Sequence, residues 1–434
     1  MSAVTLPFRA AIFDLDGTLL DSLGVWREID RRFFAAHGMA VPERFGLEVA
    51  GMSYHETAEY TVRNYLKELS PEALVEEWIW SARDEYAQRV RPVKGAVAYV
   101  RMLKRMGVKL AVATALPETL YMPCLQRLGI DVLFDALCST EQTGSGKADS
   151  AVYRMAADRL RVPCGQCAVF EDVLPGLQGA KRAGMRAYQV RQTAASPDWP
   201  AMAAVADGVI DSFDDMRRCH PFDARPRCVV FAAWCEGDPA RAYDAAADDL
   251  VLCADGGWEI ALRAGIEPDL VIGDFDSSEK PEGVEVQVHP VMKDDTDTML
   301  CLREGLRRGY DRFLIVGGMG GRLDHTLANL QSMAFAKRYG ADAEMCDGHT
   351  WCTVLENEER TIPCAPGHMS VFALSDVCEG VSIRGAKYEL ENGRLTNCFP
   401  LGVSNTFEGR EVTVRVRKGM ALVMTTGEEV RSEE

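Results

Sequence analysis

The chain has 434 residues, which exceeds the size of one ordinary hydrophobic core and predicts two or three domains. Hydrophobic residues make up 47% and charged residues 26%, a composition typical of water-soluble globular proteins. With 65 acidic and 48 basic side chains, the formal net charge of −17 argues against broad binding to nucleic acids or anionic membranes and favours a cationic substrate.

The first half of the sequence alternates apolar strands with amphipathic helices, which predicts a Rossmann-like parallel sheet with helices on both faces. Residues 22–90 interrupt this alternation with helical patterns alone and indicate a cap over the strand ends. We therefore expect an N-terminal domain at 1–218, with its core at 1–21 and 91–218 and a helical cap at 22–90. The predicted strands are Ala10–Phe13, Lys109–Ala113, Ala136–Cys138, Cys167–Phe170, Ala187–Val190 and Gly208–Ile210.

Residues 219–227 contain two prolines, mixed charge and no periodicity, and are the predicted linker. A second α/β pattern follows and predicts another α/β domain at 228–345. Beyond it the helical patterns stop, and short alternating runs predict an antiparallel β domain at 346–434. The strands expected in the α/β domain are Cys228–Ala232, Leu250–Ala254, Leu270–Gly273 and Phe313–Val316.

Two aspartates stand at the exit of the first strand. Asp14 and Asp16 are two residues apart, and their charges repel unless a cation neutralises them. Gly17 lets the chain turn directly after them. A carboxylate can attack a phosphate monoester if a second group protonates the leaving oxygen. Asp14 is therefore the candidate nucleophile and Asp16 the candidate general acid/base, with Mg²⁺ as the expected cation.

Three further groups follow along the chain. Thr114 ends the second core strand and can donate to a phosphoryl group, Lys147 follows a Gly/Ser loop and can neutralise phosphate, and the pair Glu171-Asp172 ends a strand and can complete a Mg²⁺ shell. Taken singly, each also fits a strand-end hydroxyl, a solvated lysine or a helix cap.

In this order, the groups resemble the haloacid dehalogenase-like phosphatases with a helical cap, over residues 9–215. The resemblance implies that Asp14 is the nucleophile, that Asp16 is the acid/base, and that Asp14, the backbone carbonyl of Asp16 and Asp172 bind Mg²⁺. Ala148 and Val173 depart from the family, which usually has Pro and often Ser at these positions. Neither departure removes a required group.

Acidic residues of the second half come in three groups, at Asp274 and Asp276, at 294–297 including Asp297, and at Asp324. Helix capping accounts for one or two of them. It does not account for residues 317–322, where four glycines precede Arg322 and let the backbone approach a phosphate. Asp255, followed by two glycines, adds another strand-end carboxylate.

These segments closely resemble thiamine pyrophosphokinase over residues 227–427. The resemblance implies an α/β catalytic domain followed by a β-sandwich, a homodimer, and thiamine held between domains of different subunits. It also implies transfer of the pyrophosphoryl group of ATP to thiamine with release of AMP. The residues expected at this site are Asp274, Asp276 and Asp297 around Mg²⁺ and the triphosphate, Asp324 to orient substrate, Asp255, Gly318, Gly321 and Arg322 for substrate binding, and Ser404 and Asn405 for thiamine.

Three functions stay open for the first half. It could hydrolyse thiamine monophosphate and feed the second half, which is an inference from covalent linkage alone. It could be a sugar-phosphate phosphatase or phosphomutase fused for unrelated reasons. It could also be a non-catalytic dimerisation module, although the complete set of groups argues against that. We expect no nucleic-acid or membrane partner for either half.

The fourteen cysteines, many within apolar runs, are expected to be buried free thiols in a reducing cytoplasm. Cys164 and Cys167 have the spacing of a zinc pair but lack a second pair, so a structural role is favoured. No apolar run approaches the roughly 20 residues of a membrane span, and the N-terminus lacks a signal-peptide pattern. The expected location is the cytoplasm.

Overall fold

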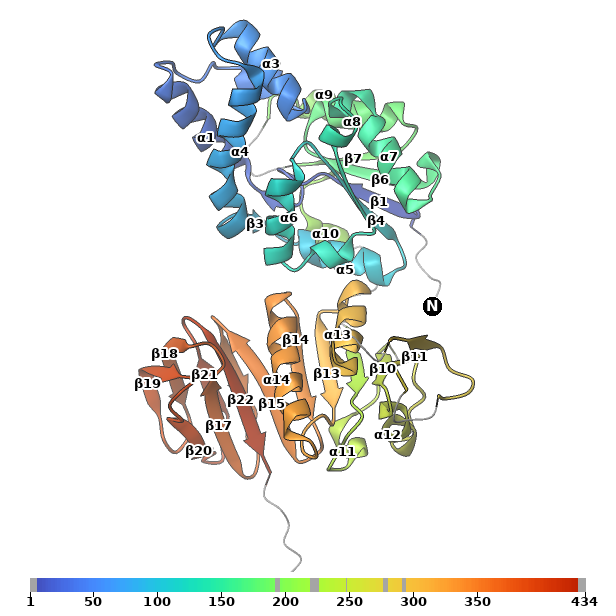
Figure 1. Cartoon of the computed structure of the whole chain (residues 1–434), viewed down its shortest axis with the longest axis vertical. Coiled ribbons are helices and arrows are strands. Elements are labelled where there is room, and N and C mark those ends of the chain that lie inside the picture. The colour runs from blue at the N-terminus through green and yellow to red at the C-terminus, as the bar shows by residue number, and fades with distance from the viewer. Residues whose placement is uncertain are drawn as a thin grey trace, which may run out of the picture. The chain divides into compact units, whose positions relative to one another are not determined.

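The computed structural model describes residues 6–191, 196–218, 226–246, 248–275, 280–290 and 294–427. The chain divides into two compact units, Met1–Ala224 and Arg225–Glu434 (Figure 1). Most of the predicted linker, residues 219–225, lies outside the described residues. No helix in the described ranges combines the length and the apolar character needed to cross a membrane.

Unit 1 is built on a six-stranded sheet in the order β5-β4-β1-β6-β7-β8, and every neighbouring pair is parallel. Residues of β1 are fully buried, as expected for a sheet covered on both faces. This architecture confirms the fold class predicted for the first half. The strands are β1 (Ala10–Phe13), β4 (Lys109–Thr114), β5 (Ala136–Ser139), β6 (Cys167–Glu171), β7 (Arg186–Val190) and β8 (Gly208–Ile210).

Two sets of helices cover the two faces of this sheet, because successive strand residues point to opposite sides. Phe13 and Phe170 face one side, and Ile12 and Val169 face the other. Helices α5 (Ala96–Arg105), α6 (Glu118–Arg127) and α10 (Phe213–Arg218) contribute to the first core cluster. The second cluster contains α7 (Ala151–Leu160), α8 (Leu174–Arg182) and α9 (Trp199–Val205).

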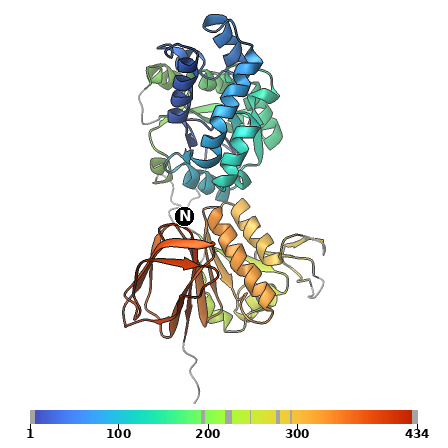
Figure 2. The same ribbon diagram turned by 60° about the vertical axis from the view of Figure 1, so that its left-hand side comes forward.

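The helical cap forms between β1 and α5. A small antiparallel pair, β2 (Leu20–Asp21) with β3 (Arg91–Pro92), joins its entry to its exit. Ser53 and Glu56 form a capping box at the start of α3, which fixes where that helix begins. Figures 1 and 2 show the cap helices, in blue, grouped at one edge of the unit. They are α1 (Leu23–Ala36), α2 (Phe45–Glu48), α3 (Tyr54–Asn64) and α4 (Pro71–Gln88).

Unit 2 contains a ten-stranded sheet in the order β12-β11-β10-β9-β13-β14-β15-β22-β17-β20. The strands from β12 to β14 pair in parallel, and those from β14 to β20 pair antiparallel. Its strands are β9 (Cys228–Phe231), β10 (Leu250–Ala254), β11 (Leu270–Gly273), β12 (Val286–Val288), β13 (Arg312–Val316), β14 (Asp342–Cys346), β15 (Thr350–Glu356), β17 (His368–Ala373), β20 (Gly402–Thr406) and β22 (Met420–Thr426). Its helices are α11 (Pro239–Ala242), α12 (Gly257–Arg263), α13 (Asp297–Arg307) and α14 (Leu323–Arg338).

A second sheet of unit 2 has the order β16-β21-β18-β19 and packs on the antiparallel part of the first to form a sandwich. The strands are β16 (Glu359–Ile362), β18 (Val377–Arg384), β19 (Leu390–Thr396) and β21 (Val412–Arg415). The predicted β domain therefore exists. However, β14 pairs with β15, so one sheet runs across the expected domain boundary at residue 345.

Candidate active sites

The first candidate site lies where β1, β4 and β6 end. Since β1 is the middle strand of the three, Asp14, Thr114 and Glu171 meet at one sheet edge. Lys147, on the 3-10 turn Lys147–Asp149, places its Nζ 2.5 Å from Asp14 Oδ1 and 2.6 Å from Glu171 Oε1. Asp14 and Lys147 are each 3% exposed, and Glu171 is fully buried. A predicted loop lysine is thus a buried bridge between two carboxylates.

Burial and charge act in opposite directions on this bridge. Burial raises the pKa of Asp14 to about 7, although the Lys147 ammonium lowers it. Burial by itself would lower the pKa of Lys147, but Asp14 and Glu171 together raise it above its ordinary value. The lysine therefore carries a positive charge where a phosphoryl group would bring negative charge.

Glu171 is a supporting residue for Lys147. Its carboxylate accepts hydrogen bonds from Lys147 at 2.6 Å, from the Tyr153 hydroxyl at 2.9 Å, and from the backbone N–H groups of Asp172 and Val173. Because four donors already bind its carboxylate, Glu171 orients the lysine. Of the acidic pair Glu171-Asp172, Asp172 is the residue that is free to bind a cation. Tyr153 was missed in the sequence, where it matches the apolar face of α7.

Oxygen atoms suited to Mg²⁺ gather beside the bridge. One carboxylate oxygen from each of Asp14, Glu171 and Asp172 lies within 4.8 Å of the others. Oδ1 of Asp172 is buried and has no hydrogen-bond partner among the described residues. Burial, and next the charge of Asp14, raise the pKa of Asp172 well above its usual range. A bound cation would offset both effects, so Asp14 and Asp172 fit Mg²⁺.

Gly17 makes room for Asp172. Its φ of 73° is left-handed, and a Cβ at this position would lie 2.0 Å from Asp172 Oδ2. The turn after the two aspartates thus requires glycine for both its backbone conformation and its clearance.

Asp16 is held from the cap. Ser22 Oγ donates to it at 2.5 Å, Trp26 Nε1 donates at 3.1 Å, and the Tyr86 hydroxyl donates as well. Burial raises the pKa of Asp16, whereas these donors lower it. Trp26 lies on α1 and Tyr86 on α4, so cap helices orient the candidate acid/base of the core. Sequence reasoning missed both residues, since nothing local connects position 86 to position 16.

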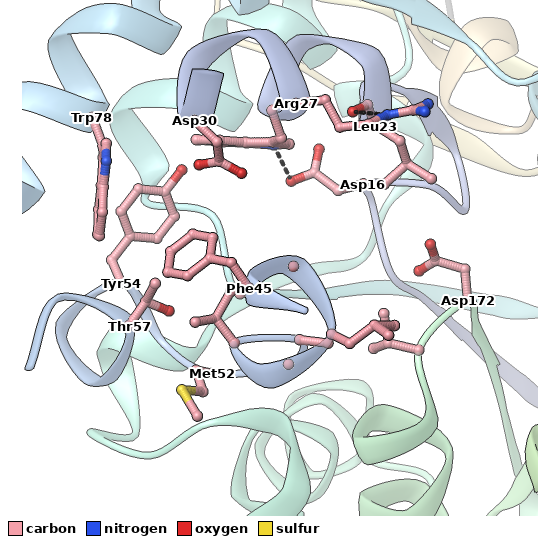
Figure 3. Close-up of a pocket in the computed structure, with 18 of the residues that line it drawn as sticks. Asp16, Leu23, Arg27, Asp30, Phe45, Met52, Tyr54, Thr57, Trp78 and Asp172 are labelled. Atoms are coloured by element: carbon pink, nitrogen blue, oxygen red, sulfur yellow. Dashed lines mark hydrogen bonds between the residues drawn. The ribbon is translucent and has the colours of Figure 1, made fainter. Parts of the chain in front are cut away.

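A cavity of about 750 Å³ extends from this carboxylate cluster into the cap (Figure 3). Asp14, Asp16, Thr114, Lys147 and Asp172 line its inner end. Thr114 is 1% exposed, and its hydroxyl oxygen accepts from the Leu116 N–H, which leaves its own hydrogen available to donate. All five predicted site residues of the first half therefore face one cavity. Its outer walls come from the cap and include Trp26, Phe45, Met52, Tyr54 and Trp78.

His55 and the pair Cys164 and Cys167 lie away from this chemistry. His55 does not line the cavity, and its side chain is 61% exposed and 3.3 Å from Glu59. Cys164 and Cys167 are free thiols, and the Cys167 Sγ contacts the carbonyl oxygen atoms of Val162 and Pro163. The structural role expected for this pair, from its lack of a second Cys pair, stays a prediction.

The second candidate site lies where β9, β10, β11 and β13 end. Asp255 follows β10 and Asp274 follows β11, and these strands pair in parallel with Ala254 beside Ile272. Asp255 is 7% exposed, and a Cβ on Gly273 would lie only 2.9 Å from its Cα. Asp255 and Asp274 are therefore neighbours at the sheet edge. Asp276 lies outside the described residues.

The glycine-rich loop follows β13 at the same edge. Gly317, Gly318, Gly320 and Gly321 all have positive φ, between 60° and 80°. A Cβ on Gly317 would lie 2.3 Å from the Trp234 carbonyl oxygen, and one on Gly320 would lie 2.0 Å from Glu236 Oε2. The segment after β9 therefore packs directly on the loop. It was not among the sequence candidates, although the exposed Trp234 sits against the loop's last glycine.

Three charged candidates lie at helix starts near this edge. Asp297 begins α13, which Thr296 caps by accepting from the Met299 N–H. Asp324 lies in the first turn of α14 and pairs with Arg322 at 2.6 Å. The hydrogen bond from Arg322 lowers the pKa of Asp324. Both partners are largely exposed, so the guanidinium can exchange this carboxylate for a phosphate.

Ser404 and Asn405 are not close to the other candidates. They lie on β20, the eighth strand along the sheet from β11, which corresponds to roughly 38 Å at about 4.8 Å per strand. Figure 1 shows β20 and β11 at opposite ends of unit 2. The Asn405 amide accepts from the Tyr388 N–H at 2.9 Å and donates to the Tyr388 carbonyl oxygen at 2.7 Å. Asn405 thus fixes the neighbouring loop.

The chain thus carries two clusters of acidic residues, each at the carboxyl ends of parallel strands. Residues 8–184 match the family model of the haloacid dehalogenase-like hydrolases. Residues 244–343 match the model of the thiamin pyrophosphokinase catalytic domain, and residues 358–421 match that of the thiamin pyrophosphokinase vitamin B1 binding domain.

Individual proteins are similar to one half of the chain or the other. Validoxylamine A 7'-phosphate phosphatase of Streptomyces hygroscopicus subsp. limoneus is 32% identical over 178 residues, covering 41% of this chain and 83% of that protein. The phosphorylated carbohydrates phosphatase of Thermotoga maritima is 30% identical over 194 residues, covering 42% and 85%. Among solved structures, thiamine pyrophosphokinase from Bacillus subtilis is 24% identical with a TM-score of 0.42, covering 47% of this chain and 99% of that one.

The chain belongs to the haloacid dehalogenase-like hydrolase family through its first half, and its second half matches the models of the catalytic and vitamin B1 binding domains of thiamin pyrophosphokinase. Both family resemblances predicted from the sequence are confirmed.

Proposed function

We propose that the chain is a bifunctional enzyme. Its first half hydrolyses a phosphate monoester with Mg²⁺ through an aspartyl-phosphate, and its second half transfers pyrophosphate from ATP to thiamine. The observation that carries the first assignment is the buried Asp14–Lys147–Glu171 bridge beside the unpartnered Asp172 oxygen. A non-catalytic dimerisation module has no need of this arrangement, which contributes little net stability.

The phosphatase reaction has two steps, in which Asp16 acts first as the general acid and then as the general base. Asp14 attacks phosphorus, the ester P–O bond breaks, and the leaving oxygen takes a proton from Asp16. Water then attacks the same phosphorus and gives a proton to Asp16, which releases inorganic phosphate and restores Asp14. Lys147 and the Thr114 hydroxyl hold the phosphoryl oxygens. Mg²⁺, held by Asp14, Asp172 and the carbonyl of Asp16, supplies charge neutralisation when bound.

The proposed substrate of this half is thiamine monophosphate, because hydrolysis would release the thiamine that the second half consumes. The rival is a sugar phosphate, since one relative is named as a phosphatase of phosphorylated carbohydrates. Phosphate release by the full chain from thiamine monophosphate and from hexose phosphates separates the two. A tenfold higher kcat/KM for sugars, about 1.4 kcal/mol of transition-state binding, would contradict the thiamine assignment.

In the second half, the thiamine hydroxyl oxygen attacks the β-phosphorus of ATP. The bond to the α–β bridging oxygen breaks and AMP leaves, while the hydroxyl proton passes to a carboxylate of the site. Asp274, Asp276 and Asp297 are the residues we assign to Mg²⁺ and the triphosphate. The Gly318–Gly321 backbone and Arg322 are assigned to phosphate, and Asp255 and Asp324 to orienting substrate. This acidic sheet edge also suits the cationic thiazolium ring.

We propose that the active form is a homodimer with thiamine bound between subunits, by Ser404 of one chain and the acidic edge of the other. The support is strand order, because one thiamine cannot span roughly 38 Å from β20 to β11 within one chain. Asn405 acts in this proposal by fixing the loop at Tyr388 beside Ser404.

Subunit complementation tests the dimer. Asp274→Asn and Ser404→Arg should each inactivate the kinase, the second by placing a cation beside the thiazolium. Equal mixing after dissociation should restore about a quarter of the wild-type rate, because half of the dimers are mixed and each of these has one intact site. No recovery in dimers shown to have exchanged subunits would contradict a shared site.

A further inference from the structure

We propose that the cap end of the phosphatase cavity is a recognition site for a flat, positively charged heteroaromatic leaving group, with Asp30 as its counter-ion. This inference rests on the proposed phosphatase activity and names the substrate class that the cap selects. The observations come from the walls of the cavity, from its unpaired polar atoms and from the charges that surround it.

The walls are aromatic. Trp26 and Tyr54 meet edge to face with their ring centroids 5.7 Å apart, and both line the cavity together with Phe45 and Trp78. A positive, planar ring gains cation–π and stacking contacts on such walls. Sugar hydroxyl groups would instead exchange water for apolar surface, which is unfavourable unless each finds a hydrogen-bond partner.

Polar atoms in these walls lack partners. The Tyr54 hydroxyl oxygen and the Trp78 Nε1 are buried and make no hydrogen bond within the described part of the chain, and Trp78 is only 4% exposed. Buried polar groups are normally hydrogen-bonded in folded proteins, so these two unpaired atoms indicate that a ligand binds here. Trp78 can donate to a ring nitrogen, and Tyr54 can donate or accept.

Asp30 lines the same cavity, and its charge acts on the Tyr54 hydroxyl. Figure 3 shows the hydroxyl end of Tyr54 turned toward the carboxylate of Asp30, which projects from α1. Burial is the cause that raises the pKa of Asp30 to about 6, with no cation lowering it. A bound cation would supply the charge that this carboxylate lacks, and an amino group could donate to its oxygen atoms.

The arginines of the cavity do not neutralise Asp30. Arg31 pairs with Glu28 at 2.7 Å, and Arg27 Nε donates to the Leu23 carbonyl oxygen at 3.3 Å. Glu43 adds a second carboxylate to the rim. The cap end therefore offers the carboxylates of Asp30 and Glu43 beside aromatic surface, which suits the thiazolium and aminopyrimidine rings of thiamine monophosphate better than it suits a sugar.

The test uses the full chain without ATP, so that the kinase is idle. Phosphate release is measured on choline phosphate and on its neutral isostere 3,3-dimethylbutyl phosphate, and on thiamine monophosphate against glucose 6-phosphate. We expect kcat/KM to favour the cationic member of each pair by at least about tenfold. Equal rates within the isosteric pair, or a preference for the neutral ester, would overturn the proposal without any variant.

Asp30→Asn should remove this preference through KM, whereas kcat/KM for p-nitrophenyl phosphate should fall much less than that for the cationic esters, since this ester carries no cation. Asp84→Asn, at an exposed aspartate of α4 outside the cavity, is the matched control. A preference that persists in Asp30→Asn would overturn the role of Asp30. Wild-type hydrolysis of p-nitrophenyl phosphate reports the phosphatase by itself. Its absence would refute the phosphatase proposal, and a normal rate without cation preference would refute the substrate class alone.

Discussion

Lys147 is the residue on which the phosphatase site depends most. It lies between Asp14 and Glu171 with almost no exposed surface, so the three side chains form one buried unit. Such a unit contributes little net stability, but removing one member leaves a charge without a partner. Its presence is better explained by the proposed chemistry than by folding, because a phosphoryl group needs a fixed positive charge beside the proposed nucleophile Asp14.

Replacing this lysine should therefore affect both stability and rate. Lys147→Met leaves two buried carboxylates uncompensated, which typically lowers the free energy of unfolding by about 3–5 kcal/mol. Phosphatase turnover should fall by about 100-fold or more, while formation of thiamine diphosphate should continue. Thermal unfolding and both assays on the full chain give the measurement. An unchanged unfolding midpoint with a normal phosphatase rate would show that the bridge is absent in solution.

The role of Asp16 as general acid should show in how the effect of its substitution depends on the leaving group. Asp16→Asn keeps the nucleophile Asp14 and the donors Ser22, Trp26 and Tyr86 nearby, but it removes the proton that the leaving oxygen needs. Hydrolysis of alkyl phosphates should fall far more than that of p-nitrophenyl phosphate, whose leaving group needs little protonation. A similar decrease for both esters would assign the general acid to another group.

At the scale of elements, both sites depend on the carboxyl ends of parallel strands, where open α/β sheets bind ligands. In unit 2, the strands β9, β10, β11 and β13 end at the same sheet edge. The glycine-rich loop after β13 packs there against the segment that follows β9. Because a side chain on Gly317 would meet the Trp234 carbonyl oxygen, this loop has little freedom to accept any other residue.

A pair of glycine substitutions separates backbone strain from this packing. Gly265 has a φ of 74°, and a Cβ there would have no neighbour within 4 Å, whereas Gly317 has a similar φ of 79° and a Cβ there would meet an atom at 2.3 Å. Gly265→Ala should cost only the left-handed strain, about 1–2 kcal/mol. Gly317→Ala should lower the free energy of unfolding by more than Gly265→Ala does, and it should also lower the kinase rate. Equal stability and kinase rates in the two variants would mean that the loop does not need its close packing.

The elements also show what the sequence could predict. Every predicted strand of unit 1 is found with its ends shifted by one residue at most, because those strands are continuous apolar runs bounded by turn residues. By contrast, β14 has a half-buried pattern and β15 lacks clear alternation. The sequence therefore did not predict that these two strands pair. The contacts of Tyr86 and Trp26 with Asp16 depend on how the cap folds over the core, which local patterns do not encode.

At the scale of the whole molecule, the chain combines two units, each with its own sheet and its own cluster of acidic strand ends. No contact between the units is needed for either proposed reaction. In the proposed function, thiamine is the compound that connects them, as product of the first site and substrate of the second. Changes at one site should therefore leave the other reaction intact, unlike the case of a single shared active site.

The most direct measurement supplies thiamine monophosphate, ATP and Mg²⁺ to the full chain and identifies the products over time. The wild-type protein should form phosphate, then thiamine diphosphate and AMP in equal amounts. Asp14→Asn should leave thiamine monophosphate untouched yet convert added thiamine, and Asp274→Asn should accumulate thiamine. Formation of ADP, or of thiamine diphosphate from the monophosphate by Asp14→Asn, would contradict the account of two successive sites.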